Sequence, residues 1–276
     1  MRWGLVALLG ASTWCVPGHA QTGQTAAEKR GNELIAAAVK ALGGDNFLQM
    51  QDRIESGRAY SFYREKISGL SIAKIYTRYI TVAPGKSGEE LGQREREAFG
   101  KDEDSAIVFN ENGGWEVNWL GSKELPKDSI DRYRNTTLRN VLYILRERLK
   151  EPGLILESRG ADIVDLQPVD IVDITDSENR VVKVYLHQST KLPVRQRYLH
   201  YNPQTKEQDE EVTIFARYRD VGSGIQWPMQ IRRERNGEKV YEIFSETVAV
   251  NQDLTDDLFT PPAPGEKITQ KSRKKK

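Results

Sequence analysis

Hydrophobic and polar residues alternate along the back half of the chain, residues 162–262, in short segments that turn residues interrupt. The apolar side chains of a segment fall on one face, as Val182, Val184 and Leu186 do, because successive side chains of a strand point to opposite faces. Turn sequences such as the Gly-Ser-Gly at 222–224 separate the segments. The pattern predicts an antiparallel sheet with one apolar face. Its expected strands are residues 154–158, 161–176, 181–188, 193–201, 211–220, 226–235 and 239–251.

Two stretches of the front half have the apolar spacing of amphipathic helices. Residues 26–42 place aliphatic side chains on one side, and two glycines follow as a stop signal. Residues 126–152 carry an apolar stripe between two prolines, which predicts one long helix with Asp128 or Ser129 as its N-terminal cap. A sheet with one apolar face needs a cover, and these helices can supply it.

Strand-forming residues dominate the chain between these two helices. The expected elements are a first hairpin of residues 54–67 and 71–82 around a Ser-Gly-Leu turn at 68–70, and two strands at 105–109 and 115–120. The charged segment 88–104 leaves two alternatives open. It is either a strand that points its charges outward or a loop.

The start of the chain has the features of a secretory signal peptide. Arg2 precedes an apolar run that is too short to span a bilayer, and a Gly-His-Ala cleavage site follows. Cys15 lacks the preceding residues of a lipoprotein signal, so the mature chain is expected to contain no cysteine. The predicted organisation is a signal peptide at 1–20, a single domain at 21–262 and a basic disordered tail at 263–276. The alternative for the first segment is an uncleaved anchor.

The charges of the chain are dense but balanced, with 41 Lys and Arg residues against 40 Asp and Glu residues. Such a balance is typical of solvated surfaces and argues against a nucleic-acid partner. The last segment, 271–276, is an exception because all of its residues except Ser272 are basic. Two interpretations of this tail stay open: a disordered solubilising segment, or weak contact with anionic lipid head groups of a membrane.

Candidate catalytic or metal-binding residues are few. After signal removal His187 and His200 remain, and two histidines without a third ligand make a poor metal site. Ser223 lies between glycines in a turn that lacks the wider pattern of a nucleophile elbow. The aspartates of 162–176 do not have the spacing of a calcium-binding loop. The sequence therefore predicts a protein that is not an enzyme, with no catalytic residue, metal site or cofactor.

Several short motifs resemble one known family. They are the Ala-Leu-Gly-Gly end of the first helix at 41–44, the Thr-Lys-Leu-Pro turn at 190–193, Trp-Pro-Met at 227–229, and the ending Val-Ala-Val-Asn at 248–251 with Phe259 and Pro261 after it. The chain resembles the LolA-like superfamily of outer-membrane lipoprotein-sorting proteins, as a divergent and longer member. The resemblance implies an α+β fold in which a curved antiparallel sheet forms an unclosed half-barrel, covered on its concave side by helices.

The resemblance also implies a function. The chain is expected to be an exported, non-enzymatic carrier or binding protein in the periplasm of a Gram-negative-type bacterium, with a lipid or acylated lipoprotein as its ligand. The alternative is an envelope protein–protein interaction or stress-sensing module with a filled core. The residues expected to line the hydrophobic cavity, or else to fill the core, are Leu142, Tyr143, Leu145, Trp115, Trp119 and Trp227.

Overall fold

The computed structural model describes residues 24–263, apart from residues 84, 87 and 203–204. Within this part of the chain, thirteen strands form one antiparallel sheet in the order β6-β5-β4-β3-β2-β1-β13-β12-β11-β10-β9-β8-β7. The strands are β1 (Asp52–Tyr63), β2 (Lys66–Tyr79), β3 (Gln93–Phe99), β4 (Ser105–Asn110), β5 (Gly113–Asn118), β6 (Gly121–Glu124), β7 (Ile155–Val164), β8 (Gln167–Thr175), β9 (Val181–His187), β10 (Pro193–Asn202), β11 (Glu207–Asp220), β12 (Gln226–Arg235) and β13 (Glu238–Val250). The predicted signal peptide and nearly all of the predicted tail lie outside the described residues.

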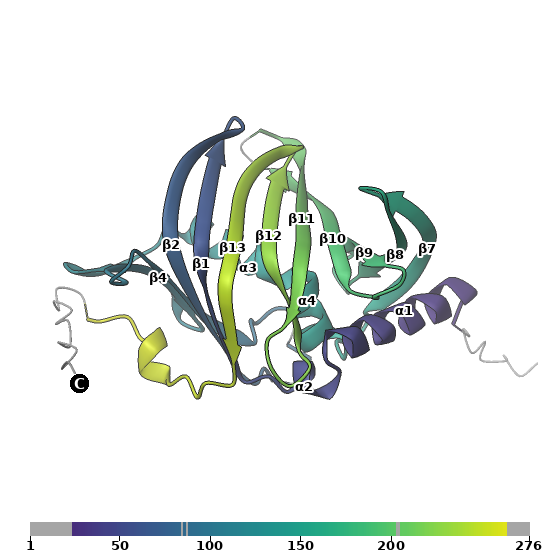
Figure 1. The fold of residues 1–276 in the computed structure, drawn as a ribbon, viewed down its shortest axis with the longest axis horizontal. Coiled ribbons are helices and arrows are strands. Elements are labelled where there is room, and N and C mark those ends of the chain that lie inside the picture. The colour runs from purple at the N-terminus through teal and green to yellow at the C-terminus, as the bar shows by residue number, and fades with distance from the viewer. Residues whose placement is uncertain (1–23, 84, 87, 203–204, 264–276) are drawn as a thin grey trace, which may run out of the picture.

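The sheet is strongly curved and open, with β6 and β7 at its two ends (Figure 1). It consists of two meanders, β1 to β6 and β7 to β13, which are joined by the pairing of β1 with β13. Asp52 holds this joint together, because its carboxylate accepts hydrogen bonds from the backbone N–H groups of Gln252 and Leu254 at 2.7 and 3.0 Å. The expected α+β fold with an unclosed half-barrel is confirmed.

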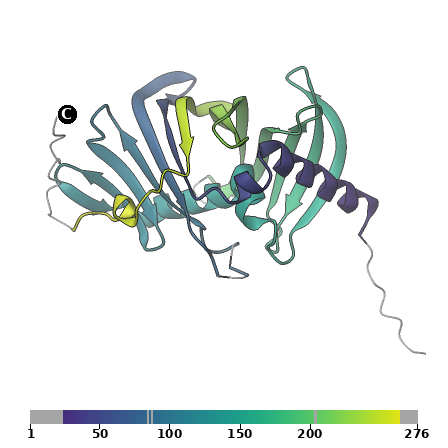
Figure 2. The same cartoon turned by 60° about the horizontal axis from the view of Figure 1, so that its bottom comes forward.

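The first helix, α1 (Ala26–Leu42), lies across the strands at the β7 end of the sheet (Figure 2). It begins with a capping box, in which Thr25 and Glu28 exchange hydrogen bonds between side chain and backbone, and it ends at Gly43. Gly31 permits close packing on the sheet, because a Cβ at this position would lie 2.3 Å from the carbonyl oxygen of Leu156 in β7. The helix predicted at 26–42 is confirmed.

The helix predicted at 126–152 is wrong as one continuous element. The structure has α3 (Lys127–Leu138), α4 (Val141–Tyr143) and a π-helical turn (Ile144–Arg148) in its place; the remaining helical segments are α2 (Asp45–Leu48) and a 3-10 helix (Asp256–Phe259). Asn140 adopts an extended backbone and accepts a hydrogen bond from the Leu142 N–H at 2.9 Å, so it starts a new helix. The break also lets the Val141 N–H donate to Gln196 Oε1 of β10 at 2.7 Å. At the start of α3, Pro126 takes the cap position that was expected for Asp128 or Ser129.

Two hairpin turns lie away from the glycines that were expected to mark them. The β1–β2 turn is Arg64-Glu65, with φ of 50° and 63°, and the β7–β8 turn is 165–166, with φ of 50° and 62°. Gly69 and Gly160 instead lie inside β2 and β7, beside register shifts in the strand pairing. The predicted turn at 68–70 and the predicted break after residue 158 are therefore wrong, because these glycines accompany β-bulges.

The main core lies between α1, α4 and the strands from β7 to β12. Its members include Ala38, Leu145, Val184 and Leu186, each with a relative exposure of 0%. A smaller core on β2 to β5 is covered by Phe259 of the 3-10 helix. None of the helices in the part of the chain that the structure describes is long and apolar enough to cross a membrane.

Candidate ligand-binding cavity

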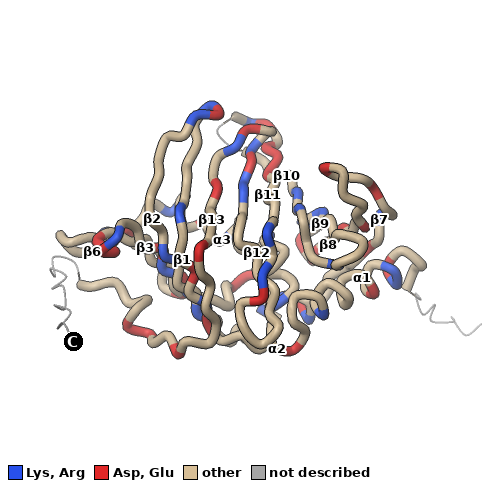
Figure 3. Tube along the Cα trace, in the orientation of Figure 1, with Lys and Arg blue, Asp and Glu red and all other residues tan. Residues whose placement is uncertain are grey.

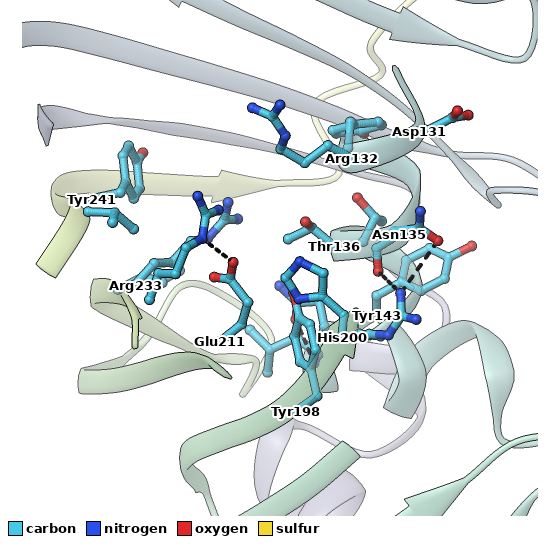
Figure 4. A pocket seen from close by; sticks show the side chains of 18 of the residues that line it. Asp131, Arg132, Asn135, Thr136, Tyr143, Tyr198, His200, Glu211, Arg233 and Tyr241 are labelled. Atoms are coloured by element: carbon cyan, nitrogen blue, oxygen red, sulfur yellow. Dashed lines mark hydrogen bonds and ion pairs between the residues drawn. The ribbon is translucent and has the colours of Figure 1, made fainter. Parts of the chain in front are cut away.

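A cavity of about 1520 Å³ lies between α3 and the sheet. Residues of β1, β3, β10, β11, β12 and β13 line one side, and residues of α3 and α4 line the other. Figure 4 shows Asn135 and Thr136 of α3 facing His200 of β10, with Glu211 and Arg233 of the next two strands beside them. Ligand pockets are commonly 300–1,000 Å³. This cavity therefore has room for a ligand larger than most small metabolites.

Strand register brings charged residues from distant parts of the chain together on the cavity floor. Arg53 of β1, Thr77 of β2 and Glu95 of β3 are partners in one row across the sheet. Glu55 and Glu97 belong to the next row on the same face, since residues two apart in a strand share a face. Figure 3 shows charged residues along the middle strands of the sheet. The four charged residues of the two rows line the cavity.

Arg53 and Trp227 are in contact at the floor of the cavity. The guanidinium carbon of Arg53 lies 4.0 Å from the centre of the Trp227 ring, an arrangement that favours a cation–π interaction. Arg53 Nη2 donates a hydrogen bond to Thr77 Oγ1 at 2.9 Å. Arg53 Nε lies 3.7 Å from Glu55 Oε2, which is an ion-pair distance but too long for a hydrogen bond. Arg53 and Trp227 are both buried, with 8% and 3% exposure.

Glu95 and Glu97 form an acidic pair on β3. Burial raises the pKa of Glu95 to about 7; the neighbouring Glu97 carboxylate adds to this rise, while Arg53 and Arg233 oppose it. Burial also raises the pKa of Glu97. Near neutral pH, Glu95 therefore carries a proton in a substantial fraction of the molecules, and the pair has less negative charge than two ordinary glutamates.

The rest of the lining is mixed. It contains polar side chains such as Asn135, Thr136 and Arg197. Its apolar side chains include Tyr79, Ile107, Phe109, Leu142, Ile231 and Ile243. Phe109 of β4 stacks on Tyr133 of α3, with ring centroids 3.6 Å apart, and this contact fixes α3 against the β3–β4 side of the sheet. The cavity thus combines a charged floor with a wall of apolar and polar side chains. Such a lining suits a ligand that has both a polar and an apolar part.

The six residues that the sequence proposed for the cavity are divided by the fold. Those that line it are Leu142, Tyr143 and Trp227. The hydroxyl of Tyr143 accepts a hydrogen bond from the Gly92 N–H at 2.7 Å. Leu145 is completely buried in the main core, Trp115 is partly buried against the smaller core, and Trp119 is 66% exposed beyond the end of β5. That the three lining residues bind a ligand stays a prediction.

The charged floor is the part of the site that sequence reasoning missed. The segment 88–104 was expected to be either a strand with outward charges or a loop, but it contains β3, which places Glu95 and Glu97 in the cavity wall. One signal was present in the sequence. Arg53 and Glu55 are two residues apart, so in a strand their side chains share one face and make that face charged.

The two histidines lie in different surroundings. His187 Nδ1 accepts a hydrogen bond from the Thr190 N–H at 3.2 Å, in the turn between β9 and β10. His200 lines the cavity and is paired in register with Asp209 of β11. Among the residues that the structure describes, no group of three or more His, Cys, Asp or Glu side chains is placed to hold a metal ion.

Comparison with known proteins supports the fold through structure. No family model and no curated protein matches this chain. A DUF1329 family protein from Desulfovibrio piger matches with a TM-score of 0.56 and 16% identity, over 86% of this chain and 98% of that one. A putative outer membrane lipoprotein-sorting protein domain from Vibrio parahaemolyticus matches with a TM-score of 0.55 and 10% identity, over 83% and 97% of the two chains. This chain therefore has a divergent LolA-like fold.

Proposed function

We propose that this protein is an exported, non-enzymatic carrier or binding protein that holds a lipid, or the acyl chains of a lipoprotein, in the cavity between α3 and the sheet. The observation that carries the proposal is the cavity itself, which measures about 1520 Å³ and has aliphatic and aromatic side chains in part of its wall. Burial of an acyl chain contributes about 0.8 kcal/mol per methylene group. Retention of such a ligand therefore needs no covalent step.

The proposed location is the periplasm of a Gram-negative-type bacterium. The signal-peptide pattern at 1–20 supports export. The Vibrio parahaemolyticus structure, which is similar in fold, is described as a putative outer membrane lipoprotein-sorting protein domain. An acylated lipoprotein is accordingly the proposed partner, and the basic tail at 271–276 is proposed to add weak contact with anionic membranes.

The charged floor favours a second candidate function, an envelope module that binds a segment of another protein in the same cavity. Arg53, Glu95 and Arg233 line this floor and offer partners for peptide amides and charged side chains. Pockets for purely apolar ligands usually contain few polar groups. The two candidates differ in what the purified protein would carry, because the first predicts extractable lipid and the second predicts a bound peptide.

Native mass spectrometry of the mature protein, purified from its own envelope, tests the proposal. We expect a stoichiometric mass addition that organic extraction removes and identifies as a lipid or an acylated peptide. A mass addition without any acyl group would support the second candidate. An unliganded mass under gentle conditions would count against the second candidate, which predicts a bound peptide. Together with no binding of added phospholipid or diacylated peptide, it would also contradict the carrier function.

A matched pair of substitutions makes the test specific to the cavity. Leu142→Trp enlarges a side chain that lines the cavity, and we expect it to reduce the bound fraction severalfold because it occupies the space of the acyl chain. Leu120→Trp makes the same chemical change at a position that is 59% exposed beyond the end of β5, and it is expected to bind as the wild type does. An equal loss of the bound fraction in both variants would indicate a general effect on folding.

A further inference from the structure

Two buried N–H groups at the cavity floor lack a hydrogen-bond acceptor within the described residues: Arg53 Nε and Trp227 Nε1. The two side chains are 8% and 3% exposed, and both line the cavity. Buried polar groups in folded proteins are nearly always hydrogen-bonded, because an unpaired one has lost its water without a replacement. Two such donors on neighbouring side chains indicate a place where an acceptor from outside the chain can bind.

The two donors are held in a fixed arrangement. The guanidinium of Arg53 stacks on the Trp227 ring at 4.0 Å, and its Nη2 is bound to Thr77 Oγ1 at 2.9 Å. Rotation of Arg53 toward another acceptor would break both of these interactions. A ligand oxygen therefore meets donors that are already positioned, which lowers the entropic cost of binding it.

The neighbouring carboxylates leave the subsite available. Glu55 lies 3.7 Å from Arg53 Nε through one oxygen, and its other oxygen accepts a hydrogen bond from Ser245. Glu95 is the next acid of the floor, and burial raises its pKa to about 7, which weakens its hold on the guanidinium. Arg233 adds a second positive charge near Glu95. Glu97 is the third acid of the floor, and burial raises its pKa as well. A neutral carbonyl adds no charge to this cluster, whereas a carboxylate can be accommodated only while the Glu95–Glu97 pair keeps a proton.

Apolar side chains that pack in the same cluster as Trp227 form part of the cavity wall. Trp227 and Leu142 belong to the same buried cluster, and Ile231 packs against that cluster. Leu142 and Ile231 also line the cavity. An extended apolar chain lying on this wall would thus have its polar end at Arg53 and Trp227.

We propose that Arg53 and Trp227 form a subsite for the oxygen atoms at the head of an acyl chain, either a fatty-acid carboxylate or an ester carbonyl. The inference rests on the proposed function and adds to it the depth and orientation of the ligand. Trp227 Nε1 and Arg53 Nε donate to the oxygen, and the chain extends from there along Leu142 and Ile231. The polar end of the ligand is consequently buried at the floor of the cavity.

The test compares laurate with methyl laurate, which have the same chain and different head groups. Isothermal titration calorimetry on the full mature chain measures their affinities for the wild type, Trp227→Phe and Arg53→Lys. Trp227→Phe keeps an aromatic ring and removes the N–H, whereas Arg53→Lys keeps the charge and removes Nε. Each variant is expected to weaken binding about five- to tenfold, as the loss of one hydrogen bond predicts. Trp119→Phe, on an exposed tryptophan, is the matched control and is expected to change nothing.

The two ligands distinguish the source of the oxygen. A larger effect of Arg53→Lys on laurate than on methyl laurate identifies a carboxylate head, because the charged hydrogen bond is then lost. Equal effects on both ligands identify a carbonyl head. Either result supports the subsite.

An independent readout is the indole N–H resonance of Trp227 in a nitrogen–proton correlation spectrum, assigned through Trp227→Phe. A new hydrogen bond to the ligand is expected to shift this resonance, and the resonance of Trp119 is expected to stay in place. Unchanged affinities in both variants, with an unshifted Trp227 resonance in the bound wild type, would overturn the subsite and leave the carrier function standing. Failure of the wild type to bind either ligand or any added phospholipid would count against the carrier function itself.

Discussion

Arg148, in the π-helical turn, and Arg53, at the cavity floor, are both almost completely buried, with 2% and 8% exposure. Arg148 Nε donates to Glu151 at 2.7 Å, its Nη2 donates to Asp176 at 3.0 Å, and its Nη1 donates to a backbone carbonyl. Arg53 donates to Thr77, but its Nε has no acceptor in the described part of the chain. Two arginines of similar burial thus differ in how many of their N–H donors have a hydrogen-bond acceptor in the protein.

The difference separates a structural region from a binding region of the same sheet. Arg148 ties the helical segment to the strands, and its partners come from residues close to the helix end and from the turn after β8. Arg53 lies where α3 does not pack directly on the sheet, so a cavity remains between them. A buried charge that is completely paired stabilises one packing arrangement, whereas an incompletely paired one beside a cavity leaves an interaction free for a ligand.

Removal of Arg148 is expected to have the largest effect on stability. Arg148→Met leaves Glu151 and Asp176 buried without their common partner, so the free energy of unfolding should fall by about 3–5 kcal/mol. Urea denaturation at pH 7 measures this loss. A loss below about 1 kcal/mol would mean that the two carboxylates find water or other partners, and it would remove the contrast with Arg53.

The equivalent change at the cavity floor should cost less. Arg53→Met is expected to lower the free energy of unfolding by about 1–2 kcal/mol. Glu55 is only 3.7 Å from Arg53 Nε and keeps its hydrogen bond from Ser245, and Glu95 can take up a proton when the opposing positive charge is removed. The same denaturation experiment, run beside Arg148→Met, gives the comparison directly. Equal losses in the two variants would show that Arg53 is a structural residue of the same kind as Arg148.

The acidic pair makes stability depend on pH. The pKa of Glu95 is about 7 in the folded protein and 4.5 as an ordinary glutamate, so the unfolded chain loses its proton first and stability falls as pH rises from about 4.5 to 7. Glu95→Gln removes this loss and should raise the free energy of unfolding by about 1–2 kcal/mol relative to the wild type at pH 8, with little difference at pH 4. Denaturation at the two pH values tests this.

A matched control is Glu116→Gln, at an exposed position on β5. It should show no such difference between pH 4 and pH 8. If Glu95→Gln is no more stable than the wild type at pH 8, then the floor is more polar than its burial implies, and Glu95 is ionised without cost.

The smallest expected effect is at the break between α3 and α4. Asn140→Ala removes the side-chain acceptor of the Leu142 N–H and should lower the free energy of unfolding by about 1 kcal/mol. Affinity for laurate, measured as above, should fall less than in Trp227→Phe, because Asn140 lines the cavity and positions Leu142 but is not part of the Arg53 floor. A loss of affinity comparable to that of Trp227→Phe would show that the two regions are coupled.

Local patterns were sufficient for several elements of the fold. The capping residues and aliphatic spacing of α1, and the alternation of Val182, Val184 and Leu186 in β9, depend on neighbours along the chain, and both elements form as the sequence predicts. The strand pattern also predicted an antiparallel sheet with one apolar face, whereas the unclosed half-barrel was implied by the resemblance to the LolA-like superfamily. These predictions succeeded because capping and alternation are properties of short segments.

Other features depended on contacts between distant residues. Gly69 was expected in a turn and Gly160 in the gap between two strands, but the pairing of their strands places them beside bulges. Asn140 interrupts a helix whose apolar stripe is continuous, because Gln196 of β10 provides a partner for the backbone of Val141. In each case the cross-strand or helix–sheet contact outweighed the local preference.

The sequence by itself determined the one-sided alternation of the strands, the first helix and its caps, and the balanced charge. Tertiary structure alone decided which charged residues face the cavity, because Arg53, Glu95 and Arg233 meet only through the register of β1 with β2 and β13, of β2 with β3, and of β12 with β13. A shift of one residue in any of these pairings would turn a strand's side chains to the other face. The burial that leaves Arg53 Nε and Trp227 Nε1 without acceptors among the described residues arises from the same long-range pairing, so it has no counterpart in the local sequence.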